Sequence, residues 1–138
     1  MLWSVGDNHW KVEKKIELHQ KKIKDATYSL WGVNFSVKKD KFKFPLRGFM
    51  HVRGTWQVHY EARVIDIVQT PDINHIPEES LEFEYKTYLV LDKLEKLSRP
   101  IPTKEFKIIS NNVFVKKPPQ SQYYVEPPDL VDEKEVKS

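Results

Sequence analysis

Aromatic side chains that could hold a flat ligand lie in the segment from residue 27 to residue 67. Trp31 and Trp56 could each present an indole face to a ring, and Tyr28 or Trp10 could supply a third wall. The competing interpretation is core packing, because tryptophan is largely buried in most proteins. If Trp31 is a wall, Trp31→Ala is expected to weaken binding by more than about tenfold with little change in melting temperature.

Polar groups that could read the edge of such a ring surround Trp31. Gly32 has no Cβ, so a ligand could approach the backbone closely at this position. Neighbouring residues add a hydroxyl and an amide, which donate and accept hydrogen bonds. The candidate edge-reading residues are Ser29, Gly32, Val33 and Asn34, with Asp7 and Asn8 as alternatives.

A cationic connector joins the aromatic stretches. Residues 1–69 carry 13 Lys and Arg against 7 Asp and Glu, whereas residues 70–138 carry 10 against 13. The basic half therefore coincides with the aromatic half, which favours a surface that attracts phosphate groups. The alternative is a solvated lysine-rich face, the usual role of a charge run. The candidate phosphate-binding residues are Lys38, Lys39, Lys41, Lys43, Arg47 and Arg53.

A hairpin is expected to carry the second aromatic stretch. Alternation from Trp56 to Val64 predicts a half-buried strand whose apolar face includes Trp56, Val58 and Tyr60. Residues 49–53 are its predicted partner across a tight turn. The basic connector before them is expected to be an exposed loop.

A helix and a later strand complete the predicted frame. The apolar spacing from Trp10 to Lys24 predicts a helix with a partly buried His19. Residues 81–91 predict a strand, which the prolines of residues 99–102 should stop. A last hairpin is expected within residues 106–115.

Three segments together resemble the PUA-like barrels of the EVE and YTH type. They are SLWGVN at residues 29–34, YEARVIDI at 60–67, and FEYKTYLVLDKLEKLSRPIP at 83–102. In that group a Ser-apolar-Trp strand ends at a pocket, another strand crosses behind it, and a strand followed by L-x-x-L-x-x-P comes next. The resemblance covers roughly residues 2–125.

The resemblance implies a reader of a flipped or single-stranded nucleobase, often methylated, held in an aromatic cage. It also implies a possible targeting module of a larger restriction or RNA-related system. The YTH proteins place a further cage tryptophan after the hairpin, and this sequence lacks one there. The base therefore stays open between methylated adenine and cytosine, with DNA weakly favoured over RNA as the partner.

One motif is typical of an enzyme. Asp72, Glu84 and Lys86 resemble the PD…ExK arrangement of nucleases, in which carboxylates hold Mg²⁺ and the lysine assists the attacking water. Glu84 and Lys86 would share one face of the predicted strand, but that is its solvent face. Such a short motif often arises by chance in a highly charged chain, so we expect a binding module and not an enzyme. The five histidines lack metal-site spacing, and no cofactor is expected.

Length and composition limit the remaining possibilities. A chain of 138 residues suits one domain, and the absence of cysteine excludes a disulfide scaffold. No apolar run is long enough for a membrane span, so a cytoplasmic protein is expected. High Lys and Glu content favours a thermophilic or archaeal source. The predicted fold is α+β, a curved, mainly antiparallel sheet or open β-barrel with one or two flanking helices.

The domain is predicted to span residues 1–125. Residues 126–138 combine proline with charge and predict a linker or frayed tail, to which a further domain or partner subunit could attach.

Overall fold

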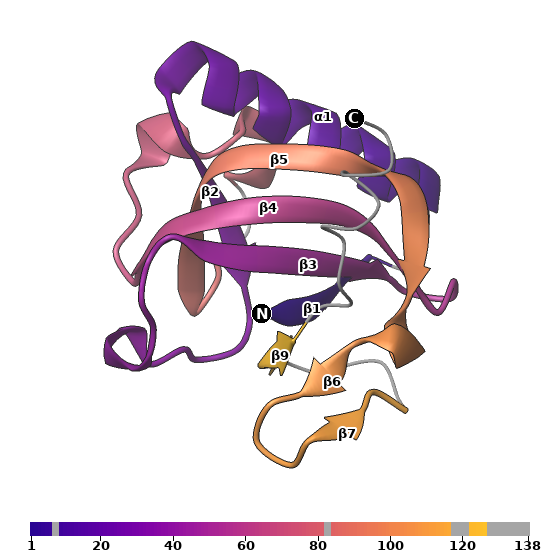
Figure 1. Ribbon diagram of the computed structural model, residues 1–138. Coiled ribbons are helices and arrows are strands. Elements are labelled where there is room, and N and C mark those ends of the chain that lie inside the picture. Colours follow the sequence, from indigo (N-terminus) through magenta and orange to yellow (C-terminus); the bar gives the residue numbers. More distant parts are fainter. Residues whose placement is uncertain (7–8, 82–83, 117–121, 127–138) are drawn as a thin grey trace, which may run out of the picture.

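A curled six-stranded sheet contains most of the strands, and one helix packs against it (Figure 1). The computed structural model describes residues 1–6, 9–81, 84–116 and 122–126. The main elements are β1 (Leu2–Val5), α1 (His9–Ala26), β2 (Ser29–Val33), β3 (Leu46–Val52), β4 (Gln57–Val68), β5 (Thr87–Pro102), β6 (Lys107–Ile108), β7 (Val113–Phe114), β8 (Gln122–Tyr123) and β9 (Val125–Glu126). Short 3₁₀ turns lie between them: η1 (Lys39–Lys41), η2 (Ile73–His75), η3 (Glu78–Ser80) and η4 (Thr103–Glu105).

The strand order of the large sheet is β2-β5-β4-β3-β1-β8, and a small sheet has the order β7-β6-β9. Neighbouring strands of the large sheet run antiparallel, except β1 and β3, which run parallel. This curved, mainly antiparallel sheet with one α-helix among the described residues confirms the predicted α+β fold class. Of the predicted tail, residues 126–138, Glu126 belongs to β9 and residues 127–138 lie outside the described residues.

Buried apolar side chains form two large clusters on the sheet. The main cluster lies between α1 and the large sheet and includes Trp3, Val12, Ile16, Trp31, Tyr60, Ala62, Val64 and Leu89. The lower cluster joins the large sheet to the small one and includes Leu2, Phe49, Val58, Ile101, Phe106 and Val125. Adjacent residues of β1 enter different clusters because successive side chains of a strand point to opposite faces. No helix in the described part of the chain is long and apolar enough to cross a membrane.

The β3–β4 hairpin forms as predicted, but the predicted apolar face of β4 is wrong. A bulge interrupts the β4–β5 register between Val58 and Tyr60. The extra residue shifts the alternation, so Val58 packs in the lower cluster and Tyr60 in the main cluster. Trp56 lies in the turn before β4, with a positive φ of 57°, and its side chain is 56% exposed. Trp56 is therefore neither a strand residue nor a core residue.

Strand β5 begins later and ends later than the sequence predicts. It starts at Thr87 and continues through the prolines to Pro102. Strand β2 pairs only with residues 87–91 of β5. Within the described sheet, the later half of β5 therefore pairs with β4 on one side and is open on the other. Prolines are tolerated in such an edge segment because no donor is required on its open side. Figure 1 shows β5 passing along the sheet and then turning toward β6.

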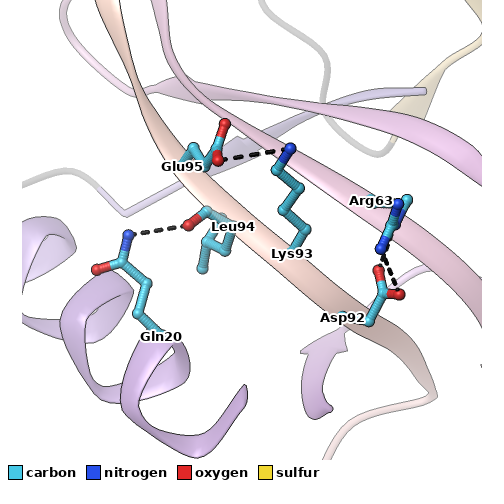
Figure 2. Close-up of polar contacts among 6 residues, drawn as sticks. All are labelled: Gln20, Arg63, Asp92, Lys93, Leu94 and Glu95. Atoms are coloured by element: carbon cyan, nitrogen blue, oxygen red, sulfur yellow. Dashed lines mark hydrogen bonds and ion pairs between the residues drawn. The ribbon is translucent and has the colours of Figure 1, made fainter. Parts of the chain in front are cut away.

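Helix α1 crosses β5 near the point where β2 no longer pairs with it. Figure 2 shows the Gln20 side chain donating a hydrogen bond from Nε2 to the Leu94 carbonyl oxygen, at 2.9 Å. A second contact joins Lys96 Nζ to Glu13 Oε1 at 3.0 Å. Polar groups of α1 thus face this part of β5, while Val12 and Ile16 of the helix are buried. The helix predicted from apolar spacing is confirmed.

Candidate ligand-binding cavity

A cavity of about 400 Å³ lies among the end of β1, the first turns of α1 and the end of β2. Its volume is within the range of small-molecule sites in proteins. Four aromatic side chains line it: Trp3, Trp31, Phe35 and Tyr85. Three cations also line it, Lys11, Lys15 and Arg53, and no Asp or Glu is among the described lining residues. The cavity is therefore aromatic and electropositive.

The Trp31 indole is a wall of the cavity and a core residue at once. Its side chain is 2% exposed and belongs to the main cluster. Helix α1 covers the ring with two residues one turn apart. The His19 ring centroid lies 4.5 Å from that of Trp31, and Lys15 Nζ lies 4.4 Å from the ring centroid. The wall interpretation and the core-packing interpretation therefore both describe Trp31.

Tyr85 is the wall that faces Trp31 across Lys15. Lys15 Nζ lies 5.8 Å from the Tyr85 ring centroid, so the ammonium group stands within reach of both π faces. The Tyr85 ring also covers Gly32, since an ideal Cβ at residue 32 would come within 2.1 Å of a ring carbon. Glycine is required there because the ring occupies the space of a side chain. Burial raises the pKa of the Tyr85 phenol, which keeps it protonated and able to donate.

Lys15 contributes a half-buried charge to the lining. Its neighbours are the Trp31 and Tyr85 rings, and it has no hydrogen bond or ion pair within the described residues. Burial lowers the pKa of Lys15 from its ordinary value.

A polar layer lies behind Trp31. Ser29 Oγ lies 2.6 Å from His19 Nδ1 and 3.5 Å from the His75 carbonyl oxygen. Burial, with the nearby charge of Lys15, lowers the pKa of His19 to about 3, so the imidazole is neutral at physiological pH. Ser29 is fully buried and bonded to His19, and it is not a lining residue. Its predicted contact with a base edge is therefore wrong.

A second serine–histidine contact supports the opposite wall. Ser4 lines the cavity, and its Oγ lies 3.0 Å from His51 Nδ1 on β3. Burial, with the nearby charges of His59 and Arg53, lowers the pKa of His51 to about 4. Neutral His51 can thus hold the Ser4 hydroxyl in place.

The structure brings some of the predicted base-binding residues together. Trp31, Gly32, Val33 and Asn34 all line the cavity. Tyr28 does not, since its ring stacks on His75 with centroids 3.6 Å apart and planes 6° apart. Among the other candidates, Trp56 is not a lining residue, Asp7 and Asn8 lie outside the described residues, and the side chain of Trp10 is not described.

The predicted phosphate-binding residues divide into three kinds. Lys39 forms an ion pair with Asp66 at 2.5 Å, and Arg47 forms one with Glu61 at 2.5 Å. These two cations are already matched by carboxylates. The others are the exposed Lys38 and Lys43, the cavity residue Arg53, and Lys41, whose side chain is not described.

The nuclease motif does not assemble. Asp72 caps η2, where its Oδ1 accepts a hydrogen bond from Asn74 N at 3.0 Å. Glu84 and Lys86 are exposed and precede β5, so they do not share a strand face. Within the described ranges, no group of three or more His, Cys, Asp or Glu side chains could hold a metal ion.

Sequence reasoning missed several lining residues. The lining residues Lys11 and Lys15 and the buried His19 recur every four residues and so share one stripe of the helix, a signal that the sequence contained. Tyr85 gave no such signal, because its place depends on the approach of the chain before β5 to Gly32. Trp3 was not among the aromatic candidates, although it is 1% exposed and lines the cavity.

Comparisons with known proteins give a likeness in structure and none in sequence. No protein-family model matches the sequence, and no curated protein matches it. A crystal structure of the YTH domain of the Zygosaccharomyces rouxii MRB1 protein, in complex with N6-methyladenosine RNA, is similar with a TM-score of 0.46 and 13% identity. The similarity covers 99% of this chain and 84% of that chain. A likeness at this level does not assign the chain to a family.

Proposed function

We propose that this domain binds nucleic acid by taking one nucleobase, flipped out of a duplex or in a single strand, into the cavity beside Trp31 and Tyr85. The observation that carries the proposal is the lining itself: four aromatic side chains and three cations, with no carboxylate among its described members. Aromatic rings favour a flat ligand, and cations favour a ligand that carries phosphate.

Tyr85 and Phe35 would provide most of the stacking surface. These two lining residues are half-buried, whereas Trp3 and Trp31 are almost fully buried. Stacking of one base on an aromatic side chain contributes on the order of 1–3 kcal/mol, which is enough to hold a base that is already unpaired.

The phosphates of the same strand would lie outside the cavity. Arg53 is an exposed residue of the cavity lining. Lys38 and Lys43 are exposed on the connector between β2 and β3. Contacts of this kind position a strand without reading its sequence.

Two finer parts of the proposal rest on the sequence motifs. The resemblance of residues 29–34, 60–67 and 83–102 to the EVE and YTH type supports a methylated base as the preferred ligand. The same resemblance supports a role as the targeting module of a larger restriction or RNA-related system. The choice between DNA and RNA is part of the test.

The test measures binding of short single strands that differ only at one central base. Fluorescence polarisation would compare DNA and RNA strands with plain and methylated central bases. Tyr85→Ala should lower affinity by more than about tenfold, because it removes a stacking partner worth 1–3 kcal/mol. Trp56→Ala is the matched control, since it removes an exposed aromatic side chain outside the cavity.

Equal loss in both variants, or no loss in Tyr85→Ala, would remove the cavity from the binding reaction. Circular dichroism and thermal melting of each variant would show that the fold is retained.

A further inference from the structure

Lys15 has an unusual set of neighbours for a half-buried ammonium group. Its Nζ lies 4.4 Å from the Trp31 ring centroid and 5.8 Å from the Tyr85 ring centroid. Cation–π contacts stabilise the charge but accept no conventional hydrogen bond. Within the described residues, no oxygen accepts a hydrogen bond from Lys15.

Other polar side chains of the lining are placed differently. Lys11, Asn34 and Arg53 are exposed. The Ser4 hydroxyl is held by His51 at 3.0 Å. Lys15 is therefore the cationic donor that lies deepest between the aromatic walls.

We infer that Lys15 is a specificity-determining residue, which makes the cavity select a base with an exocyclic oxygen over adenine. This inference rests on the proposed function. The favoured ligands are guanine, cytosine, uracil and thymine, or methylated forms of them that keep the oxygen.

The chemical reason is that an ammonium group donates hydrogen bonds and accepts none. A base carbonyl oxygen offers two lone pairs, and Lys commonly contacts guanine through O6 and N7. The exocyclic amino group of adenine is itself a hydrogen-bond donor, so the amino group and the ammonium group cannot bond to each other. Adenine then has only its ring nitrogens to offer.

A phosphate oxygen could satisfy the same ammonium group. The two sources of oxygen are distinguished by comparing nucleosides, which lack phosphate, with their 5′-monophosphates. If Lys15 reads the base, the preference between bases is already present in the nucleosides.

Inosine and adenosine are the matched probes, because their purine bases carry an oxygen and an amino group, respectively, at the same position. NMR titration of the full chain with each nucleoside would give the two dissociation constants. Inosine should bind about tenfold more tightly than adenosine, as expected for one charge-assisted hydrogen bond. N6-methyladenosine should bind no better than adenosine.

Lys15→Met should bring the ratio of the two affinities close to one, because methionine keeps an unbranched stem without the donors. Lys21→Met is the control, since Lys21 is an exposed lysine of the same helix that does not line the cavity. That variant should keep the wild-type ratio.

Equal affinity of the wild-type chain for inosine and adenosine would overturn the inference, whether or not Lys15→Met folds. A preference that appears only in the 5′-monophosphates, or that survives in Lys15→Met, would overturn it as well. If neither nucleosides nor short strands shift the resonances of cavity residues, the proposed function itself fails, which is a distinct result.

Discussion

At the scale of single residues, Trp31 has two roles that the sequence presented as alternatives. It lines the cavity, yet its side chain is 2% exposed and packs in the main cluster. A truncation therefore removes a wall and opens a core cavity together. The two effects can be separated only by measuring folding and binding on the same variants.

Trp31→Ala should lower the free energy of unfolding by roughly 3–5 kcal/mol, the usual effect of truncating a buried tryptophan. Urea denaturation at pH 7 measures this change. Tyr85→Ala should have a smaller effect on stability, because Tyr85 is half-buried. A Trp31→Ala variant with unchanged stability would show that the indole does not pack as the structure places it.

His19 links stability to pH through its buried imidazole. Its pKa is about 3 in the folded chain and about 6.5 when unfolded, so the unfolded chain binds the proton more readily. The stability that the neutral imidazole contributes is complete above pH 6.5 and is lost as pH falls from 6.5 toward 3. From pH 7 to 5, His19 should lower the free energy of unfolding by roughly 2 kcal/mol.

Urea denaturation at pH 7 and pH 5 would measure this loss. His51, whose pKa is about 4, should add to it in the same direction. His19→Gln removes one titrating group and should flatten the dependence. A slope that is unchanged in His19→Gln would assign the pH sensitivity to other groups.

At the scale of elements, the end of β2 packs against the chain before β5 at Gly32, where the Tyr85 ring occupies the space of a side chain. A Cβ at Gly32 would lie 2.1 Å from the Tyr85 ring, so Gly32→Ala must push the ring away. Overpacking of this kind typically costs 1–3 kcal/mol. We expect Gly32→Ala to lose that stability and to weaken base binding, because it displaces a cavity wall.

The double variant Gly32→Ala with Tyr85→Ala supplies the control. Once the tyrosine ring is absent, the alanine methyl group has space, and the stability lost through Gly32→Ala should be recovered. A double-mutant cycle measured by thermal melting gives the coupling between the two positions. Additive effects would show that the clash does not occur.

The elements that sequence reasoning predicted well are those with strong local patterns. Helix α1 follows from its apolar spacing and the β3–β4 hairpin from its turn residues. The errors came from long-range effects. The bulge near His59 depends on pairing between β4 and β5, and it moved Val58 and Tyr60 into different clusters. The extension of β5 through Pro102 depends on the short length of β2.

At the scale of the whole molecule, the cavity was only half visible in the sequence. Trp31, Gly32, Val33 and Asn34 are contiguous, so a local motif located them. Trp3 and Tyr85 reach the same space from distant parts of the chain, and only the curled sheet brings them there. The charge pattern of the sequence indicated a basic surface but not which cations form ion pairs. Asp66 and Glu61 neutralise two of the expected phosphate-binding residues.

The pairing of charges determines which cations contribute to nucleic-acid binding. Lys38 and Lys43 are exposed and have no ion pair within the described residues, whereas Lys39 is matched by Asp66. Single-strand binding releases counterions, and each phosphate contact adds about 0.7 to the slope of log affinity against log salt. Replacing Lys38 and Lys43 with Ala should therefore lower the slope by about 1.4.

The charge-neutral control replaces Lys39 and Asp66 together with Ala, and its slope should equal that of the wild type. Fluorescence polarisation at several salt concentrations gives all three slopes. The Lys38 and Lys43 variant should also weaken plain and methylated strands equally, since phosphate contacts carry no base information. If the slope falls equally in the control, the ion pair between Lys39 and Asp66 opens on binding and Lys39 contacts phosphate. If the slope falls neither in the Lys38 and Lys43 variant nor in the control, the connector between β2 and β3 lies away from the bound strand.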